Sequence, residues 1–186
     1  MKAALLGTTA DTQIEIWFQD EARVGQQGTH AYVWAPKGSR PAMVRDNRRD
    51  SAYIFGAICP NRRVGAAVIM PAVNSEAMNE HLKEISAMVP PNHHCALVCD
   101  GAGWHQTGHR LEMPANITLI RVPPYAPELN SMENVWQYLR ENKLCALVWQ
   151  GYDDILQACR SAWRFLIDDP DSIQSIGTRQ WACVTI

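Results

Sequence analysis

Three acidic residues occupy positions from which their carboxylates could act together. Asp20 ends one predicted strand, Asp100 ends another, and Glu133 lies inside a predicted helix beside its apolar stripe. Polar residues at strand ends in open α/β sheets form ligand sites. Three carboxylates held together repel one another and have raised pKa values unless a cation neutralises them. Hard divalent cations prefer such oxygen ligands, and two ions can activate a water or a 3′-hydroxyl and stabilise the departing oxygen. The predicted chemistry is phosphodiester cleavage or strand transfer.

Each acid also has an ordinary structural explanation. An Asp that ends a strand is usually a turn former, and an acid beside the apolar stripe of a helix is usually a solvated flank. A site forms only if the strand ending at Asp20 neighbours the strand ending at Asp100, and if the helix bearing Glu133 packs across their ends. The arrangement of the elements therefore decides between the two interpretations.

The hydrophobic pattern changes period along the chain, from strands to helices and back. Strands are predicted over Ile14–Gln19, Ala31–Trp34, Ser51–Cys59, Val64–Met70, Cys95–Cys99 and Ile117–Val122. Helices are predicted over Ser75–Met88, capped by Asn74 or Ser75, and over Glu128–Leu144 and Tyr152–Ile167. Four tryptophans fall on apolar faces and are interpreted as core or interface residues: Trp17, Trp34, Trp136 and Trp163. This order predicts an α/β protein in which helices cover a mixed sheet.

Composition favours one folded domain with a local excess of positive charge. The 186 residues are 47% hydrophobic and carry a net charge of −2, which excludes a disordered chain and a globally basic one. The stretch from residue 37 to residue 63 nevertheless holds seven cations against two anions. The cations are Lys37, Arg40, Arg45, Arg48, Arg49, Arg62 and Arg63. Such a patch binds phosphate backbones, and the alternative is an exposed loop and hairpin with ordinary surface charge.

The cysteines and the hydropathy pattern indicate a cytosolic protein. The six cysteines include no C-x-x-C pair and mostly lie in apolar runs, so we expect buried free thiols in a reducing compartment. No run of 18 apolar residues is present, and we expect no membrane association.

Three segments carry a family resemblance. FQDEAR (Phe18–Arg23), VCDGAGWH (Val98–His105) and PPYAPELNSMENVW (Pro123–Trp136) resemble the acidic blocks of the bacterial insertion-sequence branch of mariner-like transposases, the DDE superfamily endonucleases. The resemblance covers about residues 14–165. It implies a ribonuclease-H-like fold, with a mixed five-stranded sheet flanked by helices. It also implies that Asp20, Asp100 and Glu133 are the metal-binding catalytic triad.

Further residues match these blocks with less specific roles. His105 and Asn130 stand at recurrent positions and are expected to support the site or the DNA, while Arg23 is expected to contact phosphate or to pair with Glu21. Two features depart from the pattern. Only 32 residues separate Asp100 from Glu133, which a short loop deletion would explain, and Gly101 stands where such proteins often have Asn.

The resemblance implies a DNA transposase that cleaves element ends and transfers strands to target DNA with two Mg²⁺ or Mn²⁺ ions. The alternatives are a ribonuclease-H-like nuclease without strand transfer and an inactive DNA-binding remnant. Related proteins carry helix-turn-helix domains before the first block, and only 19 residues precede Asp20 here. We therefore expect residues 1–186 to form a single catalytic domain with its core at about 14–167, and DNA recognition to be lost or to reside on a separate polypeptide. Double-stranded DNA as partner, homodimerisation and a nucleoid-associated cytoplasmic location follow from the resemblance alone.

Overall fold

The computed structural model describes residues 12–26, 35–39, 48–101, 111–123, 126–145 and 147–182. The strands in these ranges form one sheet in the order β3-β2-β1-β4-β5. They are β1 (Gln13–Gly25), β2 (Ser51–Cys59), β3 (Val64–Met70), β4 (His93–Cys99) and β5 (Ile117–Arg121). β1, β2 and β3 pair antiparallel, whereas β4 runs parallel to β1 and β5 runs parallel to β4. The mixed five-stranded sheet is as predicted, and the predicted strand at Ala31–Trp34 lies outside the described residues.

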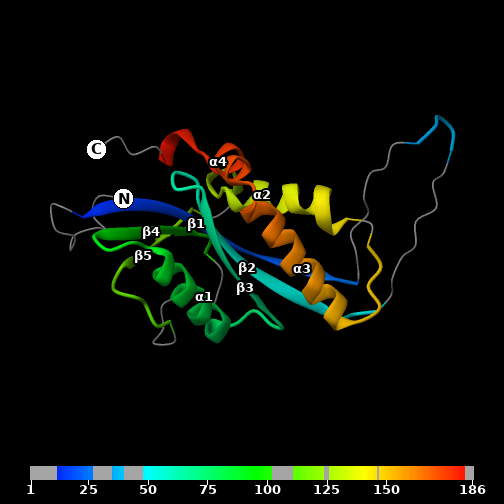
Figure 1. The fold of residues 1–186 in the computed structure, drawn as a ribbon, viewed down its shortest axis with the longest axis horizontal. Helices are drawn as coiled ribbons and strands as arrows, with labels where there is room; N and C mark the ends of the chain where they lie inside the picture. The colour runs from blue at the N-terminus through cyan, green and yellow to red at the C-terminus, as the bar shows by residue number, and fades with distance from the viewer. Residues whose placement is uncertain are drawn as a thin grey trace.

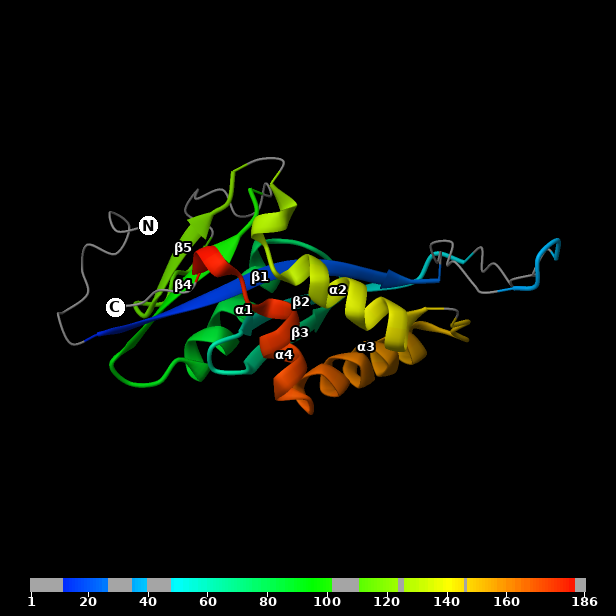
Figure 2. The same ribbon diagram turned by 90° about the horizontal axis from the view of Figure 1, so that it is seen from above.

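Helices cover both faces of the sheet (Figures 1 and 2). α1 (Ser75–Met88) lies on one face, and α2 (Met132–Leu139), α3 (Tyr152–Ile167) and α4 (Pro170–Gly177) lie on the other. The same ranges contain shorter helical segments: the 3₁₀ turns η3 (Pro127–Leu129) and η5 (Gln180–Ala182), and the π-helical η4 (Arg140–Leu144). The fold is therefore a three-layer α/β arrangement.

Two hydrophobic cores result because successive strand residues point to opposite faces. On β1, Ile16 and Phe18 pack into the core beneath α2, α3 and α4, whereas Trp17 packs into the core beneath α1. On β4, Val98 belongs to the first core and Leu97 to the second. Burial on both faces explains why β4 is a continuous apolar run.

Local signals set the bounds of α1. The side chain of Asn74 accepts a hydrogen bond from the backbone N–H of Ala77 at 2.8 Å, which identifies Asn74 rather than Ser75 as the N-cap. The helix ends at Met88, and Pro90 followed by Pro91 is the sequence signal for this end, since the residue before a proline disfavours the helical conformation.

The structure differs from the predicted elements in several places. β1 does not end at Asp20 but continues to Gly25, because its second half pairs with β2. The predicted helix at 128–144 is divided into η3, α2 and η4. α4 was not predicted, although Asp169 caps it and Pro170 occupies its first turn, a combination that marks a helix start.

The prediction of buried free thiols is confirmed for four of the six cysteines, and Cys183 lies outside the described residues. Cys59, Cys95, Cys99 and Cys159 are free and buried, and Cys145 is free but exposed. Burial raises the pKa of the Cys99 thiol to about 12. Within the described ranges, the structure contains no helix long and apolar enough to cross a membrane.

Candidate active site

Asp20 and Asp100 lie next to each other where the parallel pairing of β1 and β4 ends. The last register pair of the two strands is Phe18 with Val98, and each acid follows two residues later in its own strand direction. Asp20 is therefore inside β1 but beyond the part of β1 that β4 covers. The negative charge of Asp100 is a minor cause of the raised pKa of Asp20. The predicted adjacency of the two acid-bearing strands is confirmed.

The carboxyl group of Asp20 is half-buried and surrounded by other acids. Burial is the main cause that raises its pKa from 3.8 to about 7. The backbone N–H of Glu21 and the indole N–H of Trp136 lower the pKa, while the charges of Glu21 and Asp100 raise it. The Trp136 Nε1 atom donates a hydrogen bond to Asp20 Oδ2 at 3.0 Å. A carboxylate in such surroundings gains stability from a nearby cation.

Asn130 fixes the start of the helix that carries Glu133. Its Nδ2 atom donates to the backbone oxygen of Gln19 at 2.9 Å, and its Oδ1 atom accepts from the backbone N–H of Met132 at 3.1 Å. Asn130 is only 4% exposed, so both bonds are shielded from water. α2 is thus tied to β1 at the residue before Asp20, and Glu133 lies in the first turn of α2. The supporting role predicted for Asn130 has a concrete geometric basis here.

Glu133 is brought to this edge of the sheet but stays exposed to solvent. Among the described residues, no group of three or more His, Cys, Asp and Glu side chains is arranged to hold a metal ion. Asp20 and Asp100 interact, and the helix of Glu133 packs on β1, yet the three acids do not close into one ligand set. The donor chemistry fits a hard divalent cation, because carboxylate oxygens are the ligands that Mg²⁺ and Mn²⁺ prefer. Like-charged carboxylates without a cation between them also repel one another.

Three of the predicted basic residues, Arg48, Arg62 and Arg63, bind other groups of the protein. Arg62 binds Glu15 Oε2 at 3.2 Å and the backbone oxygen of Met88, and Arg63 binds Asp171 at 2.8 Å. Arg48 donates to the backbone oxygens of Trp149 and Gln150. Lys37, Arg48, Arg49 and Arg63 are exposed, whereas Arg62 is half-buried. Arg23 is also exposed, whereas Arg40, Arg45 and His105 lie outside the described residues.

Sequence reasoning missed one contact of the site, that of Trp136 with Asp20. Trp136 is 5% exposed and belongs to the core, as predicted, but its polar edge meets the carboxyl group. Trp17 is also buried, Trp163 is half-buried, and Trp34 lies outside the described residues. The spacing in the sequence could have indicated this contact. Trp136 follows Glu133 by three residues, so both side chains lie on the same side of the helix.

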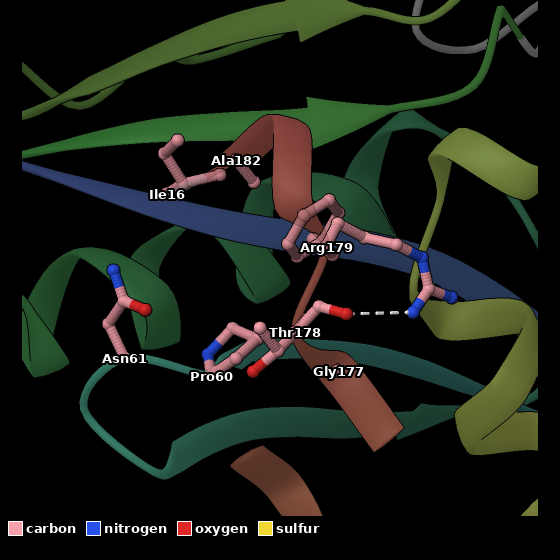
Figure 3. A pocket seen from close by; sticks show the side chains of 8 residues that line it. Ile16, Pro60, Asn61, Gly177, Thr178, Arg179 and Ala182 are labelled. Atoms are coloured by element: carbon pink, nitrogen blue, oxygen red, sulfur yellow. Dashed lines mark hydrogen bonds between the residues drawn. The ribbon is translucent and has the colours of Figure 1, made fainter. Parts of the chain in front are cut away.

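A separate shallow pocket lies between β1 and the C-terminal segment (Figure 3). It is lined by Ile16, Phe18, Pro60, Asn61, Gly177, Thr178, Arg179 and Ala182. Arg179 Nη1 donates to the backbone oxygen of Thr178 at 3.1 Å, which holds this segment together. The lining contains no carboxylate, so the pocket is not a second candidate for metal-dependent chemistry.

The protein is an α/β fold in which β1 and β4 are parallel inner strands of the sheet. Asp20 and Asp100 lie at the same end of these two strands. Comparison of the sequence with protein families gives a match to DDE superfamily endonucleases over residues 15–148, a range that includes Asp20, Asp100 and Glu133. The chain therefore belongs to the DDE superfamily endonucleases. It is also 50% identical over 131 residues to the uncharacterized protein y4pE/y4sA of Sinorhizobium fredii, a match that covers 70% of this chain and 96% of the relative.

The fold is similar to the ribonuclease-H-like fold of the mariner transposase Mos1. The Mos1 paired-end complex with Mn matches with a TM-score of 0.61 at 13% identity, over 89% of this chain and 56% of the Mos1 chain. The Mos1 strand transfer complex matches with a TM-score of 0.58 at 15% identity, over 89% of this chain and 55% of that chain. The chain thus spans just over half the length of the Mos1 chains, and the likeness concerns the fold.

Proposed function

We propose that this chain is the catalytic domain of a DNA transposase. The observation that carries the proposal is that Asp20 and Asp100 follow the same end of the parallel β1–β4 pair, in a chain that belongs to the DDE superfamily endonucleases. In the proposed reaction, water attacks a phosphodiester at the element end and releases a 3′-hydroxyl. That hydroxyl then attacks a phosphodiester of target DNA. The likeness to Mos1 complexes, which include a paired-end complex with left transposon end, supports DNA as the substrate.

Asp20, Asp100 and Glu133 would hold the divalent cations. Mg²⁺ or Mn²⁺, when bound, stabilises the charge that develops on the attacking and departing oxygens. Structures of Mos1 with Mn and with Mg support this choice of metal. Asn130 would contribute by holding the start of α2, the helix that carries Glu133, against β1. A homodimer and a separate DNA-recognition polypeptide stay predictions.

The test uses the 186-residue chain with a pre-cleaved element-end oligonucleotide, a plasmid target and Mg²⁺ or Mn²⁺. We expect joined products in the presence of metal and none with a chelator. Asp20→Asn, Asp100→Asn and Glu133→Gln should each abolish joining and cleavage while the circular dichroism spectrum is unchanged. Glu84→Gln is the matched control, because Glu84 is an exposed acid on α1, which covers the other face of the sheet.

The outcomes separate the candidate functions. Cleavage of duplex DNA without joining would indicate a nuclease without strand transfer. DNA binding without either reaction would indicate a remnant that no longer cuts. Joining that survives Asp100→Asn would contradict the assignment of the triad.

A further inference from the structure

We propose that Trp136 is a positioning residue that orients the carboxylate of Asp20 for cation binding, and that Gly56 is required because it leaves space for the Trp136 indole. This inference rests on the proposed function, since it assumes that Asp20 binds a divalent cation. It concerns Trp136 and Gly56, neither of which is one of the three acids.

The contact itself is short and shielded. Trp136 Nε1 lies 3.0 Å from Asp20 Oδ2, and the Trp136 side chain is 5% exposed. An indole N–H is a donor only and carries no charge. It therefore fixes one carboxylate oxygen without neutralising the group, whereas a lysine or arginine at this place would compete with the cation.

Gly56 on β2 faces Asp20 directly across the antiparallel pair. A Cβ atom at position 56 would lie 2.7 Å from Trp136 Cη2 and 2.9 Å from Trp163 Cζ3, both closer than real Cβ contacts. Side chains of directly opposite residues stand about 4.5–5.5 Å apart on the same face of a sheet. The missing side chain thus makes room for the indole opposite Asp20. Glycine weakens a strand interior, and close approach of another group is a common reason for its presence.

Trp136 also links two of the proposed ligands through one element. α2 carries Glu133 in its first turn and Trp136 three residues later. A shift of α2 would therefore move Glu133 and the donor to Asp20 together. Hydrogen bonds to ligating carboxylates orient these ligands, and their loss typically lowers metal affinity by about 10-fold to 100-fold.

The first experiment measures Mn²⁺ binding to the purified chain by electron paramagnetic resonance. Trp136→Phe keeps most of the ring and removes the N–H, and we expect it to weaken Mn²⁺ binding by about 10-fold or more. Trp163→Phe is the matched control, because Trp163 packs beside Trp136 with ring centroids 6.3 Å apart. We expect its Mn²⁺ affinity to equal that of the wild type. Urea unfolding of each variant shows that it is folded.

Asp20→Asn separates failure of this inference from failure of the proposed function. If Asp20→Asn loses Mn²⁺ binding and folded Trp136→Phe binds like the wild type, the positioning role is wrong and the proposed function stands. If the wild type binds no Mn²⁺, or Asp20→Asn binds as tightly as the wild type, both are wrong.

A second measurement does not depend on the folding of a tryptophan variant. In the ¹⁵N NMR spectrum of the wild type, Mg²⁺ should shift the indole N–H signal of Trp136 more than that of Trp163. Gly56→Ala should reduce this shift and weaken Mn²⁺ binding, because the added methyl group displaces the indole. An unchanged Trp136 signal at saturating Mg²⁺ would overturn the inference.

Discussion

At the scale of single residues, the site depends on neutral hydrogen-bond donors around a half-buried acid. Asp20 is stabilised by the N–H groups of Glu21 and Trp136, and neither of these donors carries a positive charge. Burial and the nearby acids act in the opposite direction and keep the pKa of Asp20 near 7. These two donors therefore bind the carboxyl group without neutralising its charge.

Asn130 gives a prediction at this scale. Asn130→Ala removes the buried hydrogen bonds to the Gln19 oxygen and the Met132 N–H, and leaves both backbone groups unsatisfied. We expect a loss of about 1–3 kcal/mol in the free energy of unfolding, measured by urea denaturation. DNA joining should fall as well, because the start of α2 is no longer fixed.

Asn142→Ala is the control for Asn130→Ala. Asn142 is exposed, and its Nδ2 atom donates to the backbone oxygen of Tyr138 at 2.8 Å. For Asn142→Ala we expect the free energy of unfolding to change by no more than about 0.5 kcal/mol. Equal destabilisation by the two substitutions would argue against a special role for Asn130.

At the scale of elements, the C-terminal helix supports the helix of the site. Ser131 Oγ donates to the backbone oxygen of Gly177, and Asn134 Nδ2 donates to that of Ile176. Arg179 Nε reaches the backbone oxygen of Glu128 at 3.4 Å. The first turn of α2 is thus held by β1 on one side and by the end of α4 on the other.

Gly177 tests this support. A Cβ atom at position 177 would lie 2.7 Å from Pro60 Cγ, and the rigid ring of Pro60 cannot rotate away. Gly177→Ala should push the end of α4 off the sheet and lower the free energy of unfolding by about 1–3 kcal/mol. Because α4 also holds Ser131, we expect weaker joining activity in addition.

Gly151→Ser is the control at this scale. A Cβ atom at position 151 meets nothing within 4 Å, and serine is a favourable N-cap for α3. Unchanged or slightly higher stability is expected. Wild-type stability of Gly177→Ala in thermal unfolding would show that α4 yields to the extra methyl group without cost.

At the scale of the whole molecule, the cations of the basic stretch lie in different surroundings. Arg62 neutralises Glu15, which is only 6% exposed, while Arg49 is exposed. If DNA lies against the exposed cations, Arg49→Ala should reduce the salt dependence of DNA binding. The slope of log affinity against log salt should become shallower by about 0.9 for each phosphate group that the variant no longer neutralises, as measured by fluorescence anisotropy.

Arg62→Ala provides the contrast with Arg49→Ala. It should leave the slope unchanged and lower stability, because it removes a partner from the buried carboxylate of Glu15. A slope that changes with Arg62→Ala and not with Arg49→Ala would reverse the two roles.

The sequence by itself determined the elements with strong local signals. Ser51–Cys59 and Val64–Met70 were predicted to the residue, because a turn separates two apolar runs of strand period. The cap at Asn74 and the prolines after Met88 bounded α1 in the same way. The acidic blocks indicated the three acids, since their residue types and spacing are visible without a structure.

Only the tertiary structure decided how these acids are surrounded. β1 continues past Asp20 because β2 pairs with it, and Asp20 meets Asp100 because β4 lies parallel to β1. Trp136 lies 116 residues from Asp20 in the sequence, and its contact depends on the space left by Gly56. Periodicity and capping act over a few residues, whereas these contacts depend on strand pairing and packing between distant segments.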